Sequence, residues 1–205
     1  MSDTWKNIAR KAQERAVISA ATELIGEKGF VLTTMDEIAE RAGISKATIY
    51  KLFPSKEALL VRVMESINEE MVGEIKELQP GEFPEVFPRL LDLFLSQVER
   101  RQNFVRLLTT EAFSHGPFLK EGRKALYHRI IENRKFYRQT IEKLVEQGKN
   151  SGYIKDSPKM VSGFILATLK GVVSETPFYQ GEEFRKFLNF VKEKILAMVG
   201  LGGEI

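Results

Sequence analysis

Residues 33–56, TTMDEIAERAGISKATIYKLFPSK, decide the fold, and their pattern predicts two short helices joined by a tight turn. Thr34 and Glu37 form the T-x-x-E pattern of a capping box, in which each side chain accepts a hydrogen bond from a backbone amide at a helix start. Gly43 ends this first helix, because glycine adopts the left-handed conformation at low cost. Ser45 is expected to cap a second helix that begins at the next residue.

The second short helix is expected over residues 46–53, where Ile49 and Phe53 lie four residues apart on a buried face. Pro54 ends it, because the residue before a proline is disfavoured in the helical conformation. Two short helices joined by a glycine-containing turn are typical of the helix-turn-helix, whose second helix lies in the major groove of DNA. The sides away from the buried face are therefore expected to meet DNA.

Four residues on those sides are candidate DNA contacts with different roles. Lys46, in the first turn of the second helix, can reach either a guanine edge or a phosphate. Ala47 and Thr48 are small enough to let the helix approach closely, and their methyl groups suit thymine. Lys51 is expected either to contact DNA or to face solvent.

Three residues at helix starts are further candidates for phosphate contacts. Thr34 and Ser45 are helix caps first, and a phosphate contact through an amide or hydroxyl is an addition to that role. Ser55 is expected to cap the next helix, which places Lys56 at its positive end, where phosphate is favoured. Residues 41–56 contain four basic residues and no acidic one.

The run T-T-x-x-x-I-A-x-x-A-G-I-S-K-A-T-I-Y-K-L-F-P-S-K-E-A-L resembles the N-terminal DNA-binding domain of the TetR family of bacterial transcriptional regulators. The resemblance covers about the first sixty residues. It implies that Tyr50 and Lys56 contact phosphate, with a packing role as the alternative for Tyr50. It also implies an all-helical protein whose second domain binds a ligand, dimerises and varies in sequence.

The rest of the chain shows helical spacing, so the expected fold class is all-α, with about nine helices. A three-helix helix-turn-helix domain is expected over residues 1–54, and a helical effector-binding and dimerisation domain over residues 55–205. The first helix is expected to end at Gly29. The later helices are predicted over residues 55–78, 85–101, 104–113, 118–147, 159–174 and 183–199. The helix over residues 55–78 joins both domains, so it is predicted to transmit a ligand signal.

A ligand pocket of the kind that the resemblance implies would lie among the helices over residues 85–147. The side chains there suit a small hydrophobic or amphipathic effector. Core packing is the alternative for each aromatic residue. Glu111, His128 and Arg134 are candidates for binding the polar end of the ligand, and a surface ion pair is the alternative for each of them. The candidate lining residues are Phe94, Phe104, Leu108, Glu111, Phe113, Tyr127, Phe136 and Tyr137.

The last two helices are predicted to form the contact of a homodimer. Gly163, Ala167 and Gly171 recur at four-residue spacing, and such a stripe of small residues lets a partner backbone approach closely. A four-helix contact with twofold symmetry suits an operator of two half-sites. The last helix carries more apolar side chains than one neighbour would cover, and its expected contacts are Phe184, Phe187, Val191 and Ile195.

Composition and motifs limit the other possibilities. The chain of 205 residues has a net charge of +3, is 43% hydrophobic and contains no cysteine. His115 and His128, its two histidines, lack the spacing of a zinc site, and no nucleophile or phosphate-loop motif occurs. We therefore expect no catalytic residue, metal or cofactor. A secretory signal and an apolar span of membrane length are also missing, so the expected location is the cytoplasm.

The expected function is transcriptional regulation, with a repressor that releases its double-stranded operator when a small, largely apolar molecule binds the second domain. The residues do not distinguish repression from activation. One alternative is an effector-independent architectural DNA-binding protein, which a second domain without a ligand-sized cavity would favour. The other is an enzyme with an incidental helix-turn-helix, which turnover of a metabolite or a bound metal would favour.

Overall fold

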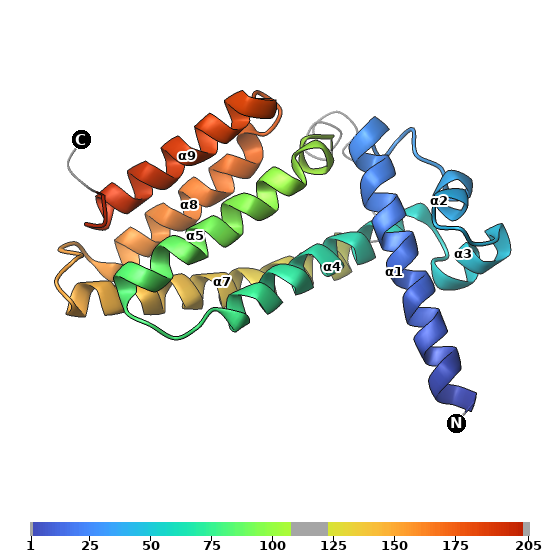
Figure 1. Ribbon diagram of the computed structural model, residues 1–205, viewed down its shortest axis with the longest axis horizontal. Coiled ribbons are helices and arrows are strands. Elements are labelled where there is room, and N and C mark those ends of the chain that lie inside the picture. The colour runs from blue at the N-terminus through green and yellow to red at the C-terminus, as the bar shows by residue number, and fades with distance from the viewer. Residues whose placement is uncertain (1, 108–122, 203–205) are drawn as a thin grey trace. The chain divides into compact units, whose positions relative to one another are not determined.

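The computed structural model describes residues 2–107 and 123–202, with side chains described over residues 5–107 and 135–202. Within these ranges all regular structure is helical (Figure 1), which confirms the predicted all-α fold class. Residues 102–107 are helical in addition to the helices named next. These are α1 (Ser2–Lys28), α2 (Met35–Arg41), α3 (Lys46–Leu52), α4 (Lys56–Glu77), α5 (Phe83–Arg100), α7 (Arg123–Asn150), α8 (Pro158–Glu175) and α9 (Gly181–Met198). None of the described helices combines the length and apolar character that a membrane span requires.

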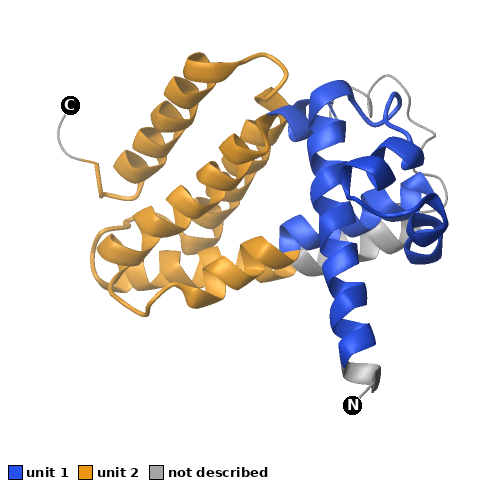
Figure 2. Ribbon diagram, turned by 45° about the vertical axis from the view of Figure 1, so that its right-hand side comes forward, with its two compact units in different colours: residues 1–68, 103–127 blue, residues 69–102, 128–205 orange. Residues whose placement is uncertain are grey.

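The chain divides into two compact units, which Figure 2 colours separately. Unit 1 comprises residues 1–68 and 103–127, and unit 2 comprises residues 69–102 and 128–205. The first boundary falls inside α4, whereas the sequence predicted a domain boundary between residues 54 and 55. The difference has a packing reason, because Leu59, Leu60 and Val63 of α4 are buried in the same core as α1, α2 and α3.

The core of unit 1 holds the helix-turn-helix in place. Ile38 of α2 and Ile49 of α3 are fully buried beside Ile25 of α1. Burying one such side chain stabilises the fold by roughly 1.5–3 kcal/mol. Gly26 allows a close approach to the helical segment at residues 102–107, since a Cβ at this position would lie 3.4 Å from the backbone nitrogen of Phe104.

Unit 2 packs α5, α7, α8 and α9 around a second apolar core. Phe83 and Phe87 of α5 are fully buried, and their ring centroids lie 5.1 Å apart. The sequence predicted that the long helix ends near residue 147 because Gly148 follows, but α7 continues to Asn150. A Cβ at Gly148 would lie only 2.9 Å from the Phe83 ring, so this glycine permits close packing rather than ending the helix.

Candidate functional site

A capping box lies at the start of α2, as predicted. The backbone N–H of Thr34 donates to Oε2 of Glu37 at 2.9 Å, and the backbone N–H of Glu37 donates to Oγ1 of Thr34 at 3.3 Å. Nζ of Lys28 donates to the same carboxylate at 2.5 Å. These hydrogen bonds, with that from Lys28 the largest cause, lower the pKa of Glu37 to about 2. The start of α2 is thereby fixed to the end of α1.

A left-handed glycine and a second cap set the direction of α3. Gly43 has a φ of +68°, the conformation predicted for it at the end of the first short helix. Oγ of Ser45 accepts a hydrogen bond from the backbone N–H of Thr48 at 3.1 Å. Phe53 then takes an extended backbone conformation before Pro54, and α3 ends. The predicted helix-turn-helix is therefore confirmed in its local geometry.

One side of α3 is buried and the other sides are open. Ile49 is fully buried and Phe53, just beyond the helix, is 6% exposed. The α-helix has a diameter of about 10–12 Å with its side chains, which matches the major groove of about 12 Å. The exposed or half-buried side chains are those that the sequence assigned to DNA, namely Lys46, Ala47, Thr48, Tyr50 and Lys51.

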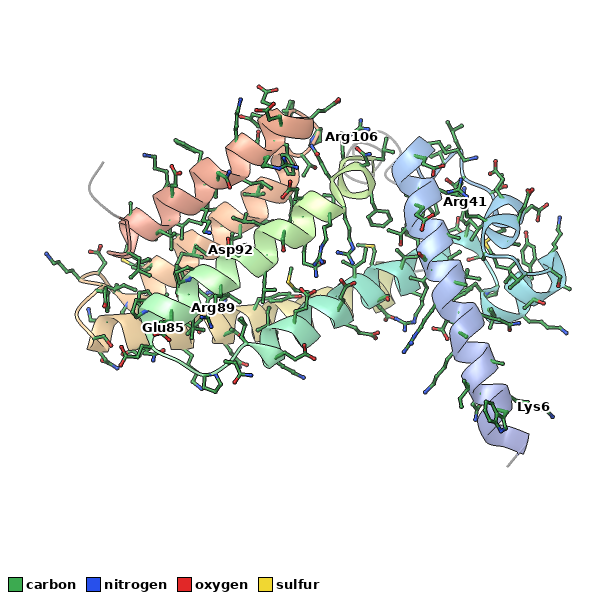
Figure 3. The ribbon with its side chains drawn as sticks, in the orientation of Figure 1. Lys6, Arg41, Glu85, Arg89, Asp92 and Arg106 are labelled. Atoms are coloured by element: carbon green, nitrogen blue, oxygen red, sulfur yellow. The ribbon has the colours of Figure 1, made fainter. Side chains whose placement is uncertain are left out.

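The cations near α3 differ in the strength of their ion pairs within the protein. The Arg41 guanidinium donates to both carboxylate oxygens of Glu27, at 2.9 and 3.1 Å; Figure 3 labels Arg41. Nζ of Lys46 donates to Oδ2 of Asp36 at 2.7 Å, but both side chains are more than half exposed, so water competes for this pair. Within the described residues, Lys51 forms no ion pair. Lys46 and Lys51 are therefore the cations of α3 that can turn to DNA at little cost.

Lys56 is held by the turn before α2. Its Nζ donates to the backbone oxygens of Phe30 at 2.8 Å, Val31 at 3.2 Å and Thr33 at 2.8 Å. The same atom lies 4.5 Å from the centroid of the Phe30 ring. An ammonium group has three N–H donors, which the three carbonyls match in number. The resemblance assigned Lys56 to phosphate, and in this geometry a phosphate contact requires the exchange of one of these bonds.

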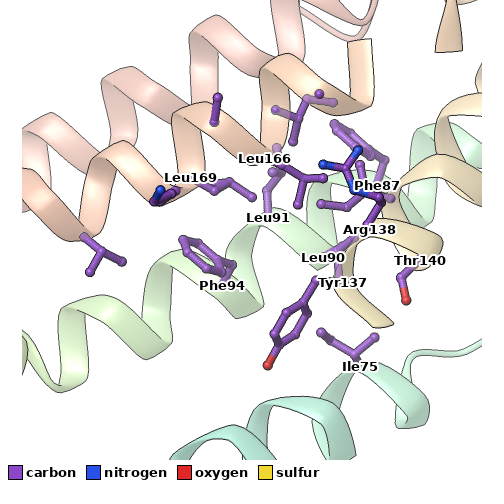
Figure 4. Close-up of a pocket in the computed structure, with 16 residues that line it drawn as sticks. Ile75, Phe87, Leu90, Leu91, Phe94, Tyr137, Arg138, Thr140, Leu166 and Leu169 are labelled. Carbon is purple, nitrogen blue, oxygen red and sulfur yellow. The ribbon is translucent and has the colours of Figure 1, made fainter. Parts of the chain in front are cut away.

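Unit 2 contains a cavity of about 450 Å³ lined by residues of α4, α5, α7 and α8 (Figure 4). Among the residues whose side chains are described, its polar lining consists of Tyr137, Arg138, Thr140 and Lys170 and includes no carboxylate. Burial raises the pKa of Tyr137 to about 12, so its hydroxyl stays protonated and can donate a hydrogen bond. Aliphatic and aromatic side chains form most of the wall, including Ile75, Phe87, Leu90, Leu91, Phe94 and Leu166.

The structure brings part of the predicted ligand set to this cavity. Phe94 and Tyr137 line it, whereas Phe136 lines an adjacent open groove. Phe104 is 5% exposed within the core of unit 1 and does not belong to the lining. The remaining predictions fall on residues or side chains outside the described ones: Leu108, Glu111, Phe113 and Tyr127, together with His128 and Arg134.

Three polar side chains of the cavity, and the contributions of α4 and α8 to its wall, were not predicted from the sequence. Arg138 and Thr140 follow the predicted Tyr137 on α7, and Lys170 comes from α8. Helical spacing places residues 137, 140 and 141 on one face, which was the available signal. Gly163 and Ala167, predicted as dimer contacts, also line the cavity. A Cβ at Gly163 would meet nothing within 4 Å, so the small residues of α8 leave room there.

The other predicted dimer contacts divide by burial. Phe184, Val191 and Ile195 are buried in the core of unit 2, because these positions of α9 pack inward. Phe187 is half-buried and stacks on Tyr179 with ring centroids 4.5 Å apart. Gly171 has open space at its Cβ position. The large apolar side chains that α8 and α9 leave exposed are different ones, namely Met160, Phe164, Phe190 and Met198.

Metal binding finds no support in the described part of the chain. Among those residues, no group of three or more histidine, cysteine, aspartate or glutamate side chains can hold an ion. His115 lies outside the described residues, and only the backbone of His128 is described.

Comparisons with known proteins agree with the helix-turn-helix. Residues 17–63 match the family model described as "Bacterial regulatory proteins, tetR family". The uncharacterized HTH-type transcriptional regulator YerO of Bacillus subtilis (strain 168) is 29% identical over 192 residues, which cover 91% of this chain and 62% of that protein. The chain thus spans less than two thirds of the length of this relative.

Two solved structures share the fold over nearly the whole chain. A TetR transcription regulator from Haloarcula marismortui superposes with a TM-score of 0.76 at 19% identity, covering 91% of this chain and 96% of that one. The transcriptional regulator FadR from Bacillus subtilis, solved in complex with stearoyl-CoA, has a TM-score of 0.64 at 24% identity, covering 90% and 98%. At these identities the likeness shows an N-terminal helix-turn-helix followed by a helical domain.

Proposed function

We propose that the chain belongs to the TetR family of bacterial transcriptional regulators and is a homodimeric repressor whose DNA affinity falls when a small, largely apolar molecule binds unit 2. One observation carries the proposal: a single helix, α4, contributes to both sites. Leu60 and Val63 of α4 belong to the core that supports the helix-turn-helix, and Ile75 of the same helix lines the cavity.

The proposed DNA contact places α3 in the major groove of an operator. Lys46 contacts a base edge or phosphate after leaving Asp36, and the exposed Tyr50 hydroxyl and Lys51 contact phosphate. Ala47 and Thr48 allow the close approach that these contacts require. The caps Thr34 and Ser45 and the turn held by Lys56 position the backbone amides at helix starts, where phosphate is favoured.

The proposed effector binds in the cavity of unit 2. Its volume of about 450 Å³ lies within the range of roughly 300–1,000 Å³ that is usual for small-molecule sites. A mostly apolar wall with a few hydroxyl and cationic groups suits a ligand with a hydrophobic body. The stearoyl-CoA bound to the similarly folded FadR protein of Bacillus subtilis supports this ligand class. A cavity of this size also disfavours the architectural alternative, which has no use for a ligand.

The proposed coupling runs along α4. A ligand changes DNA affinity only if it binds one position of α4 better than another, because equal affinity for both positions shifts no population. Ile75 gives the ligand a direct contact with this helix. Coupling energies of this kind are typically about 1–3 kcal/mol, so we expect the ligand to weaken DNA binding by roughly 5–150-fold.

The proposed dimer uses the exposed apolar surface of α8 and α9. Phe164 is 55% exposed and Phe190 is 56% exposed, which is unusual for side chains of this size. Phe190→Glu should therefore shift the protein from dimer to monomer in sedimentation velocity runs. The matched variant Asn189→Glu changes an exposed polar neighbour and should leave the dimer intact. Equal sedimentation of both variants as dimers would contradict this contact.

The regulator proposal is tested with a duplex that the protein itself selects from a random-sequence library. Binding is followed by fluorescence anisotropy with and without palmitoyl-CoA as a probe for the cavity. We expect a selected half-site motif repeated with twofold symmetry, and a dissociation constant that rises by at least about fivefold with the probe. Selection of no sequence preference would contradict the operator, and an unchanged constant at saturating bound probe would contradict the ligand response.

A further inference from the structure

A second, open space adjoins the cavity of unit 2. It is a groove of about 830 Å³ along the end of α4, the turn at residues 78–81 and the later part of α7. Ile75 and Thr140 line both the groove and the cavity. Figure 4 shows these two side chains with Tyr137, whose hydroxyl end points towards α4. The two spaces therefore meet at Ile75 and Thr140.

The groove differs in chemistry from the cavity. Its described lining carries two exposed lysines, Lys76 of α4 and Lys143 of α7, and one carboxylate, Glu146. Within the described part of the chain neither lysine forms an ion pair, and Nζ of Lys76 lies 5.9 Å from the centroid of the Phe136 ring. Amide side chains add neutral donors, and Nε2 of Gln147 already reaches the backbone oxygen of Gly81 at 3.2 Å. This lining suits an anion that stays partly in solvent.

From this arrangement we infer that the cavity and the groove form one two-part site, for a ligand that joins an apolar chain to a phosphate-bearing head group. The inference rests on the proposed function, since it names the ligand class of the same site. The chain occupies the cavity, and the head group lies in the groove between Lys76 and Lys143, with the junction at Ile75 and Thr140. Lysine ammonium groups bind phosphate as point charges, which an open groove with two lysines allows.

A simpler ligand is the competing possibility. A carboxylate could end beside the cations of the cavity itself, Arg138 and Lys170, and leave the groove empty. Arg138 already lies 3.3 Å from a carboxylate oxygen of Glu142, one turn along α7, so it is partly neutralised. Lys76, Lys143 and Lys170 form no such pair among the described residues, so the groove offers two unpaired lysines and the cavity one, which favours the groove for a larger anionic group.

The test compares four probes by calorimetry below their micelle concentrations: palmitoyl-CoA, palmitoyl lysophosphatidic acid, palmitate and coenzyme A alone. Both phosphate-bearing lipids share the proposed chemistry, and their ranking tells an acyl thioester from a lysophospholipid. We expect at least one of them to bind about tenfold more tightly than palmitate, because the head group gains charge-assisted hydrogen bonds. Coenzyme A alone should bind weakly, because it lacks the chain.

The variant K76E/K143E should remove this advantage of the phosphate-bearing lipids while changing palmitate affinity by less than about twofold. The matched control K135E/K155E makes the same charge change at two exposed lysines that line neither space, and it should keep the advantage. The inference is overturned if palmitate binds as tightly as both phosphate-bearing lipids, if the advantage survives K76E/K143E, or if no lipid probe binds.

DNA release by the same probes separates the inference from the proposed function. If the phosphate-bearing lipids bind tightly through Lys76 and Lys143 but do not release the selected duplex, the two-part site is supported and ligand-responsive regulation is contradicted. If palmitate releases the DNA as well as both phosphate-bearing lipids do, ligand-responsive regulation is supported and the two-part site is overturned.

Discussion

The helix-turn-helix and the cavity of unit 2 are specified in different ways. In the helix-turn-helix, each helix end is set by a residue within four positions of it: Thr34 with Glu37, Gly43, and Ser45 with Thr48. The cavity is formed instead by side chains from four helices, and Ile75 and Leu166 on its wall lie 91 positions apart in the chain.

This contrast teaches where each site is vulnerable. Local hydrogen bonds place α3, so a change of charge on its exposed face should alter DNA binding without altering the fold. The cavity has no such local support, and its shape depends on which side chains the helices bring together. The following variants test this contrast, and they are ordered from the largest expected effect to the smallest.

The largest effect is expected from reversing the charges that α3 presents. K46E/K51E replaces two exposed cations and should lower affinity for the selected duplex by about 100-fold or more, because phosphate and base contacts become repulsive. Thermal unfolding should change little, since the Asp36 pair is exposed and water-screened. K135E/K155E controls for net charge, and an equal loss of affinity in both variants would show that only the total charge matters.

A smaller effect, on the stability of unit 1, is expected from a change at Lys56. Lys56→Ala removes three hydrogen bonds to the turn at residues 30–33 and should destabilise unit 1 by about 2 kcal/mol. Hydrogen exchange of peptides covering residues 30–41 reads this unit directly, and protection there should fall by roughly thirtyfold. If exchange is unchanged while DNA affinity drops, Lys56 acts as a phosphate contact rather than as a clamp on the turn.

In the cavity, two glycines of α8 form a matched pair. A Cβ at Gly163 or at Gly171 would meet nothing within 4 Å, but only Gly163 belongs to the described lining. Gly163→Leu should fill ligand space and weaken palmitoyl-CoA binding by about tenfold, whereas Gly171→Leu should change it by less than about twofold. Equal effects of the two variants on calorimetric affinity would mean that α8 does not line the ligand site.

The smallest effect is a change in acid stability at the capping box. The pKa of Glu37 is lowered to about 2 from its ordinary value of 4.5, with the hydrogen bond from Lys28 as the main cause. A lowered pKa means that the carboxylate stabilises the fold above about pH 4.5, and that this contribution is lost as the pH falls towards 2. In thermal unfolding, the Glu37→Gln variant should therefore lose less stability than the unchanged protein as the pH falls from about 4.5 towards 2. Glu40→Gln, at an exposed carboxylate of α2, should keep the original profile.

The same contrast explains what the sequence could predict. Short-range rules identified the capping box, Gly43 and the Ser45 cap, because each acts through the backbone a few residues away. The four-residue spacing of Ile49 and Phe53 identified the inward side of α3. These rules did not identify the protein contacts of Lys56, whose carbonyl partners lie 23–26 positions earlier in the chain.

In unit 2 the aromatic residues were recognised but not their surroundings. Phe94 and Tyr137 line the cavity, whereas Phe104 packs in the core of unit 1. Gly163, which was predicted as a dimer contact, also lines the cavity. Helical periodicity tells which residues share a face, but several helices compete to cover that face. The resemblance therefore implied a ligand pocket in the second domain, but helical periodicity did not determine which side chains line the cavity.

The most direct test of the central claim, that α4 links the two sites, is a measurement of reciprocity. Palmitoyl-CoA affinity is measured by calorimetry for the free protein and for the protein saturated with its selected duplex. Linkage requires that DNA weakens ligand binding by the same factor by which the ligand weakens DNA binding, expected to be at least about fivefold. Equal ligand affinity in the two states would contradict the account, because the cavity and the helix-turn-helix would then act independently.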